Sequence, residues 1–159
     1  MLNFLKTSVD IQGLRTELIV QAFADRILVL VTQVGKVGNL IQASIPSAIP
    51  LRLDASFDRP DPAPELLPSP PAAIQLTPLF GSAPSEHMQT LHSLYAAQIA
   101  TLVWLAEDEE LMGSDRRSVI VGIALRKAPS GREDLNEERD TYHGIMDALR
   151  RLLTKISMS

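Results

Sequence analysis

The chain has 159 residues, 45% hydrophobic and 21% charged, which predicts one folded domain with a core and excludes global disorder. A formal net charge of −4 argues against the concentrated basic surface that broad nucleic-acid binding needs, and the absence of cysteine excludes disulfides, zinc-thiolate sites and thiol nucleophiles. The sequence contains neither a run of roughly 18 apolar residues nor a recognisable signal peptide. We therefore expect a soluble protein of the cytoplasm or nucleus that binds neither nucleic acid nor a membrane.

The N-terminal third reads as four short β-strands, because apolar or alternating runs are separated by brief polar or glycine-containing breaks. The expected strands cover residues 7–11, 17–23, 27–32 and 39–44. Short connections between consecutive strands require antiparallel pairing, so the sequence predicts a meander.

The third of these strands is the most hydrophobic. Ile27 to Val31 contains no polar residue, which predicts that both faces of this strand are covered. Gly35 and Gly38 follow, and glycine tolerates positive φ, so a hairpin turn into the fourth strand is expected.

The composition then changes to a proline-rich stretch. Eight of the eleven prolines lie between Pro46 and Pro71, and proline removes backbone donors and disfavours helix. We expect a disordered insert at about residues 46–72 within a single domain spanning 1–159; a polyproline ligand for an aromatic groove is the alternative. Residues 73–79 can re-enter the sheet as a strand that Pro78 restricts to an edge or an end.

A long helix is expected after Pro84, with Ser82 or Ser85 as its N-cap and an apolar stripe from Met88 to Ala106. The acidic residues 107–110 stand where this helix should end, so we expect them to project into solvent.

A strand at residues 118–125 and a helix at 133–155 complete the predicted order. One face of this strand narrows to Gly122 and Ala124, which suggests close approach by a helix backbone. The prediction is an α+β fold: an antiparallel β-sheet of about six strands with two helices packed on it.

No pattern of catalytic or metal-ligating residues emerges. His87, His92 and His143 lack the spacing of a metal motif and are expected at the surface or boundary, and the acidic run lacks the alternating ligands of a calcium loop. The glycine-flanked Lys36 is followed by valine and a further strand, whereas a phosphate-binding loop needs Lys-Ser/Thr and a helix. We expect no enzyme activity, no cofactor and no metal.

The stretch from Arg26 to Leu40 (RILVLVTQVGKVGNL) resembles the proteasome assembly chaperone 3 family, in which an apolar strand runs into a Thr-Gln-x-Gly-Lys-x-Gly turn. Residues 20–23 are similar to the family's second strand. The resemblance is specific over residues 18–40 and architectural over 73–156, and the proline-rich insert and the segment 131–159 are longer than the family suggests.

The resemblance implies a non-catalytic chaperone of 20S proteasome biogenesis. Family members pair with the related proteasome assembly chaperone 4 as a heterodimer, bind α-subunits during α-ring assembly, and use no nucleotide or metal. Whether this chain alone forms a homodimer stays open.

The turn supplies the candidate protein-contact residues, which are Gln33, Lys36, Val37 and Leu40; a merely solvent-exposed turn is the competing interpretation. Two other functions are compatible with the sequence. One is a small dimeric adaptor or scaffold domain of trafficking machinery, and the other is a weak enzyme or nucleotide-binding protein that uses Lys36.

Overall fold

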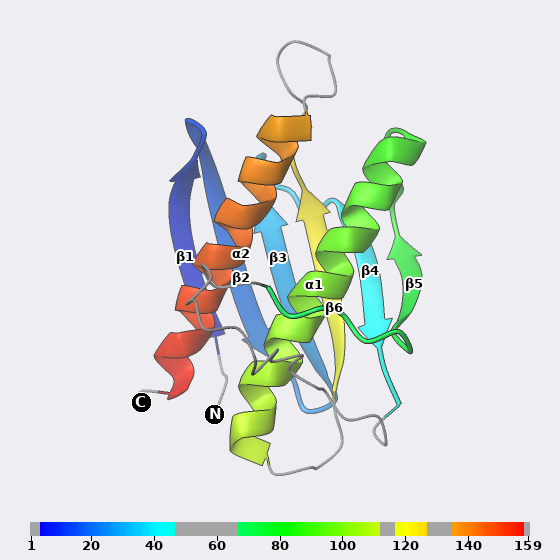
Figure 1. Ribbon diagram of the computed structural model, residues 1–159, viewed down its shortest axis with the longest axis vertical. Helices are drawn as coiled ribbons and strands as arrows, with labels where there is room; N and C mark the ends of the chain where they lie inside the picture. The colour runs from blue at the N-terminus through cyan, green and yellow to red at the C-terminus, as the bar shows by residue number, and fades with distance from the viewer. Residues whose placement is uncertain (1–3, 47–66, 112–116, 127–134, 158–159) are drawn as a thin grey trace, which may run out of the picture.

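The computed structural model shows a single six-stranded sheet with both helices on one of its faces (Figure 1). The structure describes residues 4–46, 67–111, 117–126 and 135–157. The elements in chain order are β1 (Phe4–Ile11), β2 (Leu14–Ala22), β3 (Arg26–Thr32), β4 (Asn39–Ser44), β5 (Gln75–Phe80), α1 (Glu86–Leu111), β6 (Ser118–Ala124) and α2 (Leu135–Ser157). The predicted α+β class is confirmed, and every predicted strand and helix is present. Most of the proline-rich insert and the loop around Pro129 lie outside the described residues.

The strand order is β1-β2-β3-β6-β4-β5, and it corrects the predicted meander. β1, β2 and β3 do form consecutive antiparallel hairpins. β3 and β4, however, are not neighbours, because β6 lies between them, parallel to β3 and antiparallel to β4. The predicted hairpin through Gly35 and Gly38 is therefore wrong, and that connection instead spans the end of β6.

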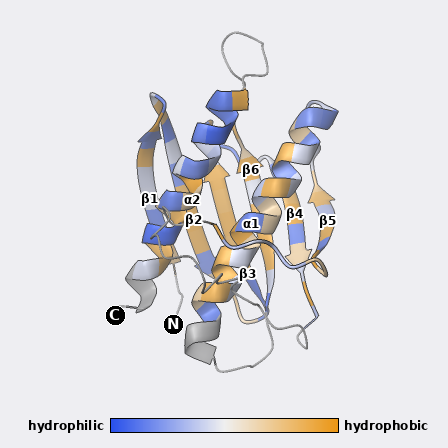
Figure 2. Cartoon of the chain, in the orientation of Figure 1, coloured by the Kyte–Doolittle hydropathy of each residue, from blue (hydrophilic) through white to orange (hydrophobic). Residues whose placement is uncertain are grey.

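The core lies between the helices and one face of the sheet. Side-chain burial alternates along each of the four innermost strands. The fully buried side chains lie on the helix side and are in register across the sheet. One such row runs from Val20 through Val29 and Val121 to Ile41, and all four side chains are at most 1% exposed. Figure 2 shows the same centre as a hydrophobic block of strands beneath the two helices.

α1 is buried on all sides in its middle, since every residue from Tyr95 to Trp104 is buried. The sheet lies beneath it, α2 lies beside it, and the segment 67–74 crosses its outer side (Figure 1). Gln98 holds that segment by donating its amide to the Pro68 carbonyl at 2.8 Å. The Ser85 hydroxyl accepts the Met88 N–H at 3.2 Å, which confirms Ser85 as the N-cap.

Two polar residues of α1 are more buried than the sequence suggests. His92 is only 4% exposed, so the expectation of a surface or boundary position is wrong for this histidine. Glu107 is 5% exposed and pairs with Arg117, so it does not project into solvent. A guanidinium that arrives from the start of β6 explains how this carboxylate is tolerated inside the protein. Within the described residues, no helix is long and apolar enough to span a membrane.

Candidate partner-binding face

The connection from β3 to β4 crosses the end of β6 in close contact. Gly38 has φ +68, and a Cβ built on it would lie 2.1 Å from the Ile123 carbonyl oxygen. A Cβ on Gly122 would lie 3.0 Å from the Val37 carbonyl oxygen and 2.5 Å from Leu30 Cδ2. The narrow face of β6 is thus approached by this loop and by leucine side chains, where the sequence suggested a helix.

Gln33 anchors the loop on the helix side of the sheet. Its backbone N–H donates to the Ala124 carbonyl at 2.8 Å, its side-chain amide donates to the Thr16 hydroxyl at 3.1 Å, and its side-chain oxygen accepts the Arg126 N–H at 3.1 Å. These bonds join β2, β3 and the end of β6. Gln33 is therefore a structural bridge between strands, and its polar groups are engaged within the protein.

The tip of the loop is exposed but internally braced. The Thr32 hydroxyl accepts the backbone N–H groups of Val34 at 3.2 Å and Lys36 at 3.1 Å. The Lys36 side chain is exposed, as is the Val37 side chain at 48%. The structure thus brings Val37 and Leu40 together over Gly122, leaves Lys36 at the tip, and places Gln33 on the opposite side of the sheet.

Leu40 belongs to a larger surface, which we call the open face: the side of the sheet turned away from both helices. One row of register partners across it is Ile19, Leu30, Gly122, Leu40 and Phe80. The adjacent row is Gln21, Leu28, Ile120, Gln42 and Thr77. The aliphatic side chains of these rows are of intermediate burial, and neither described helix lies over them. The expectation that both faces of β3 are covered is not met by the described elements, because Leu28 and Leu30 lie on the side turned away from both helices.

Aromatic and charged residues frame the open face. Phe80 ends one row at the β5 edge and is 71% exposed, while Phe4 extends the other row at the β1 edge and is 56% exposed. Lys6 and Glu17 lie at the margin on β1 and β2. An apolar centre with aromatic anchors and a charged rim is the anatomy of a protein–protein interface.

Of the residues on this face, the sequence prediction named Leu40 but not Leu28, Leu30 or Ile120. The sequence did contain a feature that could have indicated this face. Two helices can cover one side of a six-stranded sheet, so apolar residues on both sides of β3 leave one set without a helix above it.

The buried polar groups on the helix side form local structural networks. The Tyr142 hydroxyl donates to the Gln98 side-chain oxygen at 3.3 Å, and the Tyr95 and Tyr142 rings lie 5.0 Å apart. Burial raises the pKa of Tyr142 to about 12. Burial, then the neighbouring Tyr142 and Glu138, raise the pKa of Tyr95 as well. Both phenols therefore stay neutral and serve packing between α1 and α2.

His92 lies under the start of β4, where the Asn39 amide nitrogen is 3.2 Å from its Nδ1. Its buried Nε2 has no hydrogen-bond partner among the described residues. Burial lowers the pKa of His92, so the ring is neutral near pH 7.

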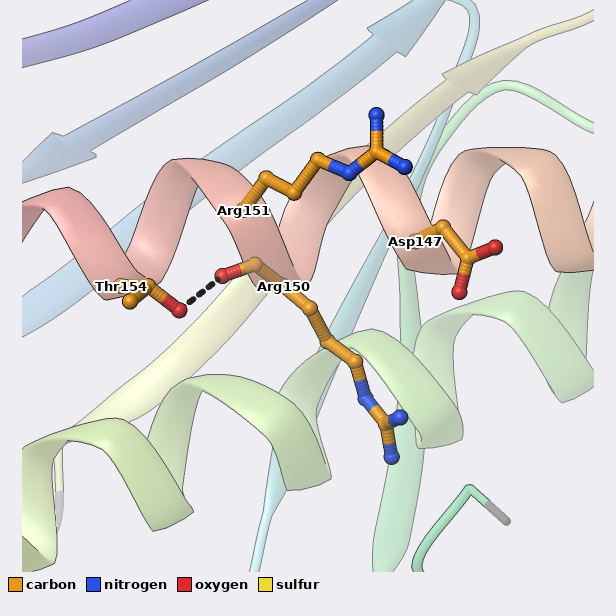
Figure 3. A pocket seen from close by; sticks show the side chains of 4 residues that line it. All are labelled: Asp147, Arg150, Arg151 and Thr154. Atoms are coloured by element: carbon orange, nitrogen blue, oxygen red, sulfur yellow. Dashed lines mark hydrogen bonds between the residues drawn. The ribbon is translucent and has the colours of Figure 1, made fainter. Parts of the chain in front are cut away.

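A shallow depression of about 470 Å³ lies along the outside of α2, lined by Asp147, Arg150, Arg151 and Thr154 (Figure 3). Thr154 donates its hydroxyl to the Arg150 carbonyl at 2.7 Å, and the two arginine side chains point to different sides of the helix. Across the described ranges, no group of three or more His, Asp or Glu side chains is placed to hold a metal ion.

Comparison with known proteins gives little beyond this geometry. No family model matches the sequence, and no curated protein matches it. Among solved structures, one match is a chain of the "Crystal Structure of a Novel Chaperone Complex for Yeast 20S Proteasome Assembly". It is 13% identical with a TM-score of 0.47, and the match covers 94% of this chain and 98% of that one. A likeness this slight assigns no function.

Proposed function

We propose that this protein is a non-catalytic chaperone of 20S proteasome biogenesis that acts in the cytoplasm or nucleus. In this proposal it pairs with the related proteasome assembly chaperone 4 and binds α-subunits during α-ring assembly. The proposal is supported by the Thr32–Gly38 turn motif, through which the sequence resembles the chaperone family, and by the open face of the sheet. The open face is the observation that carries it.

Among the described elements, none covers the open face, and contact with water is unfavourable for a contiguous apolar surface. Leu28, Leu30, Leu40 and Ile120 adjoin one another in two neighbouring rows of the register. Each side chain would add roughly 1.5–3 kcal/mol on going from exposed to fully buried, and part of that gain is still to be realised on this half-buried face. A partner that offers a similarly apolar sheet would supply the missing cover.

Charged side chains at the rim of the open face would favour a partner with complementary charges. Lys6, Arg15 and Glu17 lie on β1 and β2 on the same side as the apolar rows. Arg15 is held in place by Ser8, whose hydroxyl accepts the Arg15 Nε–H at 3.0 Å, and by Glu17 at 3.5 Å. Charges at the rim of an interface affect partner choice and association rate more than affinity.

The test is to place a charge at the centre of the open face, where a bound partner would bury it, and to measure pairing. Ile120 lies in the middle of the face, on β6, so Ile120→Lys should reduce co-purification with co-expressed proteasome assembly chaperone 4 at least about tenfold, because the ammonium would have to be desolvated in the interface. Capture of an α-subunit by the purified pair should fall in parallel.

Leu94→Lys is the matched control, since Leu94 is 56% exposed on α1 and α1 lies on the other side of the sheet. The fluorescence of Trp104, the single tryptophan and 1% exposed, reports whether each variant is folded. Wild-type protein that purifies with neither the chaperone nor an α-subunit contradicts the proposal. Recovery of small GTPases or membrane-tethering factors instead would favour the trafficking adaptor.

A further inference from the structure

The two edges of the sheet differ in how they resist pairing with another strand. At the β5 edge, Pro78 lacks a backbone N–H, and the register shifts so that Leu79 has no partner in β4. Such interruptions protect edges. β1 at the other edge has eight regular residues without proline or bulge, each paired with β2 on its inner side. Its outer backbone groups have no strand neighbour within the described sheet.

The sequence of β1 is complementary to itself. In an antiparallel pair with its two-fold axis at Ser8, Lys6 of each copy stands opposite Asp10 of the other, on the open-face side. On the helix side, Leu5 stands opposite Ile11 and Thr7 opposite Val9. Within its own sheet, the register neighbour of Lys6 is the uncharged Ile19, whereas Asp10 stands opposite Arg15.

We propose that β1 pairs with β1 of a second copy of this chain, antiparallel about Ser8, and joins the two sheets edge to edge. A two-fold axis perpendicular to the sheet keeps the helices of both copies on one side. Moving the axis by one residue sets Lys6 opposite Ser8 or Ser8 opposite Asp10, so only the axis at Ser8 matches the opposite charges. The surface is an edge, which leaves the open face available to a different partner and makes the inference independent of the proposed function.

An edge contact is narrow compared with the interfaces of permanent dimers. We therefore expect a concentration-dependent dimer that weakens as salt screens the two Lys6–Asp10 pairs. Analytical ultracentrifugation of wild-type protein over a range of concentrations and salt measures this directly.

A cysteine at position 8 tests the register. The chain has no cysteine, so Ser8→Cys introduces a single thiol. Directly opposed residues have Cβ atoms about 4.5–5.5 Å apart, close to the separation that a disulfide spans after a small shift. Under mild oxidation Ser8→Cys should cross-link several-fold more than Thr77→Cys, which places an exposed thiol on the other edge strand, β5. Equal cross-linking of the two variants would overturn the proposal.

Charge reversals at positions 6 and 10, made in the Ser8→Cys variant, provide a second test of the proposed register. Lys6→Glu alone sets two carboxylates against each other in each pair, Asp10→Lys alone sets two ammonium groups against each other, and both should cut cross-linking several-fold. A mixture of the two variants restores opposite charges at both positions and should recover the cross-linked dimer. Failure of the mixture to exceed the separate variants would also overturn the proposal, because loss of stability in either variant cannot produce recovery on mixing.

Discussion

Gly38 is fixed by two independent constraints at one residue. Its φ of +68 disfavours any side chain, and the Ile123 carbonyl occupies the place of a Cβ at 2.1 Å. Gly35 shares the first constraint, with φ +70, but has no heavy atom within 4 Å of a built Cβ. The two glycines of the motif therefore have different roles, and the sequence pattern could not distinguish them.

We expect Gly38→Ala to lower the free energy of unfolding by about 2–5 kcal/mol, from about 1–2 for the left-handed conformation and about 1–3 for the collision with backbone. Gly35→Ala should lower it by only about 1–2 kcal/mol. Urea denaturation followed by Trp104 fluorescence measures both. Equal losses would show that the loop does not press on β6.

We expect acid to destabilise the folded protein through His92. Burial lowers its pKa in the folded state from the ordinary value of 6.5, so below pH 6.5 the unfolded chain takes up a proton that the folded protein resists. The stability contributed by the neutral ring is complete above pH 6.5 and is lost as the pH falls toward the lowered value, by about 1.4 kcal/mol per pKa unit of difference.

The comparison that isolates this effect is His92→Gln against His143→Gln, which changes an exposed histidine. Between pH 7.5 and 5.5, His143→Gln should lose stability as wild-type does, and His92→Gln should lose less, by urea denaturation at each pH. An identical loss in all three proteins would contradict the assignment.

At the level of elements, the sequence predicted every strand and helix and the antiparallel pairs β1–β2 and β2–β3, but not the place of β6 between β3 and β4. The pattern of β4 is the same whether it pairs with β3 or with β6, since alternation records which face is buried and not which strand lies alongside. The short link of residues 33–38 favoured a hairpin. Gly122 was the one local hint of the true arrangement, because a glycine within a strand marks close approach by other chain.

One ion pair fastens the end of α1 to the sheet. Arg117 pairs with the buried Glu107 and also donates to the Phe23 carbonyl at 2.8 Å, and its own carbonyl accepts the Trp104 indole N–H at 2.8 Å. Glu107→Gln or Arg117→Met alone should lower the free energy of unfolding by about 3–5 kcal/mol, since each removes one partner of an ion pair whose carboxylate is buried.

The double variant should cost less than the sum of the two, which a double-mutant cycle by urea denaturation measures. The exposed pair of Asp25 and Arg26, 3.6 Å apart, is the control and should contribute about 1 kcal/mol or less. Strict additivity at Glu107 and Arg117 would show that the two side chains do not interact.

At the scale of the whole molecule, the proposed use of the open face links the free energy of unfolding to the concentration of the binding partner. A partner that binds only the folded protein adds stability by mass action, about 2.7 kcal/mol at a free concentration 100 times its dissociation constant. Addition of proteasome assembly chaperone 4 should therefore raise the thermal unfolding midpoint in a concentration-dependent way, and Ile120→Lys should abolish the rise. A midpoint that does not move with added chaperone would count against pairing through this face.

Because β6 lies between β3 and β4, the sheet cannot be completed during translation until β6 has been synthesised. Roughly 80 residues separate the end of β4 from the end of β6, which at about 5–20 residues per second is about 4–16 s of translation. Throughout that interval the nascent chain holds two hydrophobic strands whose shared neighbour has not been made. The ribosome-bound protein is thus most exposed to aggregation midway through its own synthesis, and folding is completed only when its last third emerges.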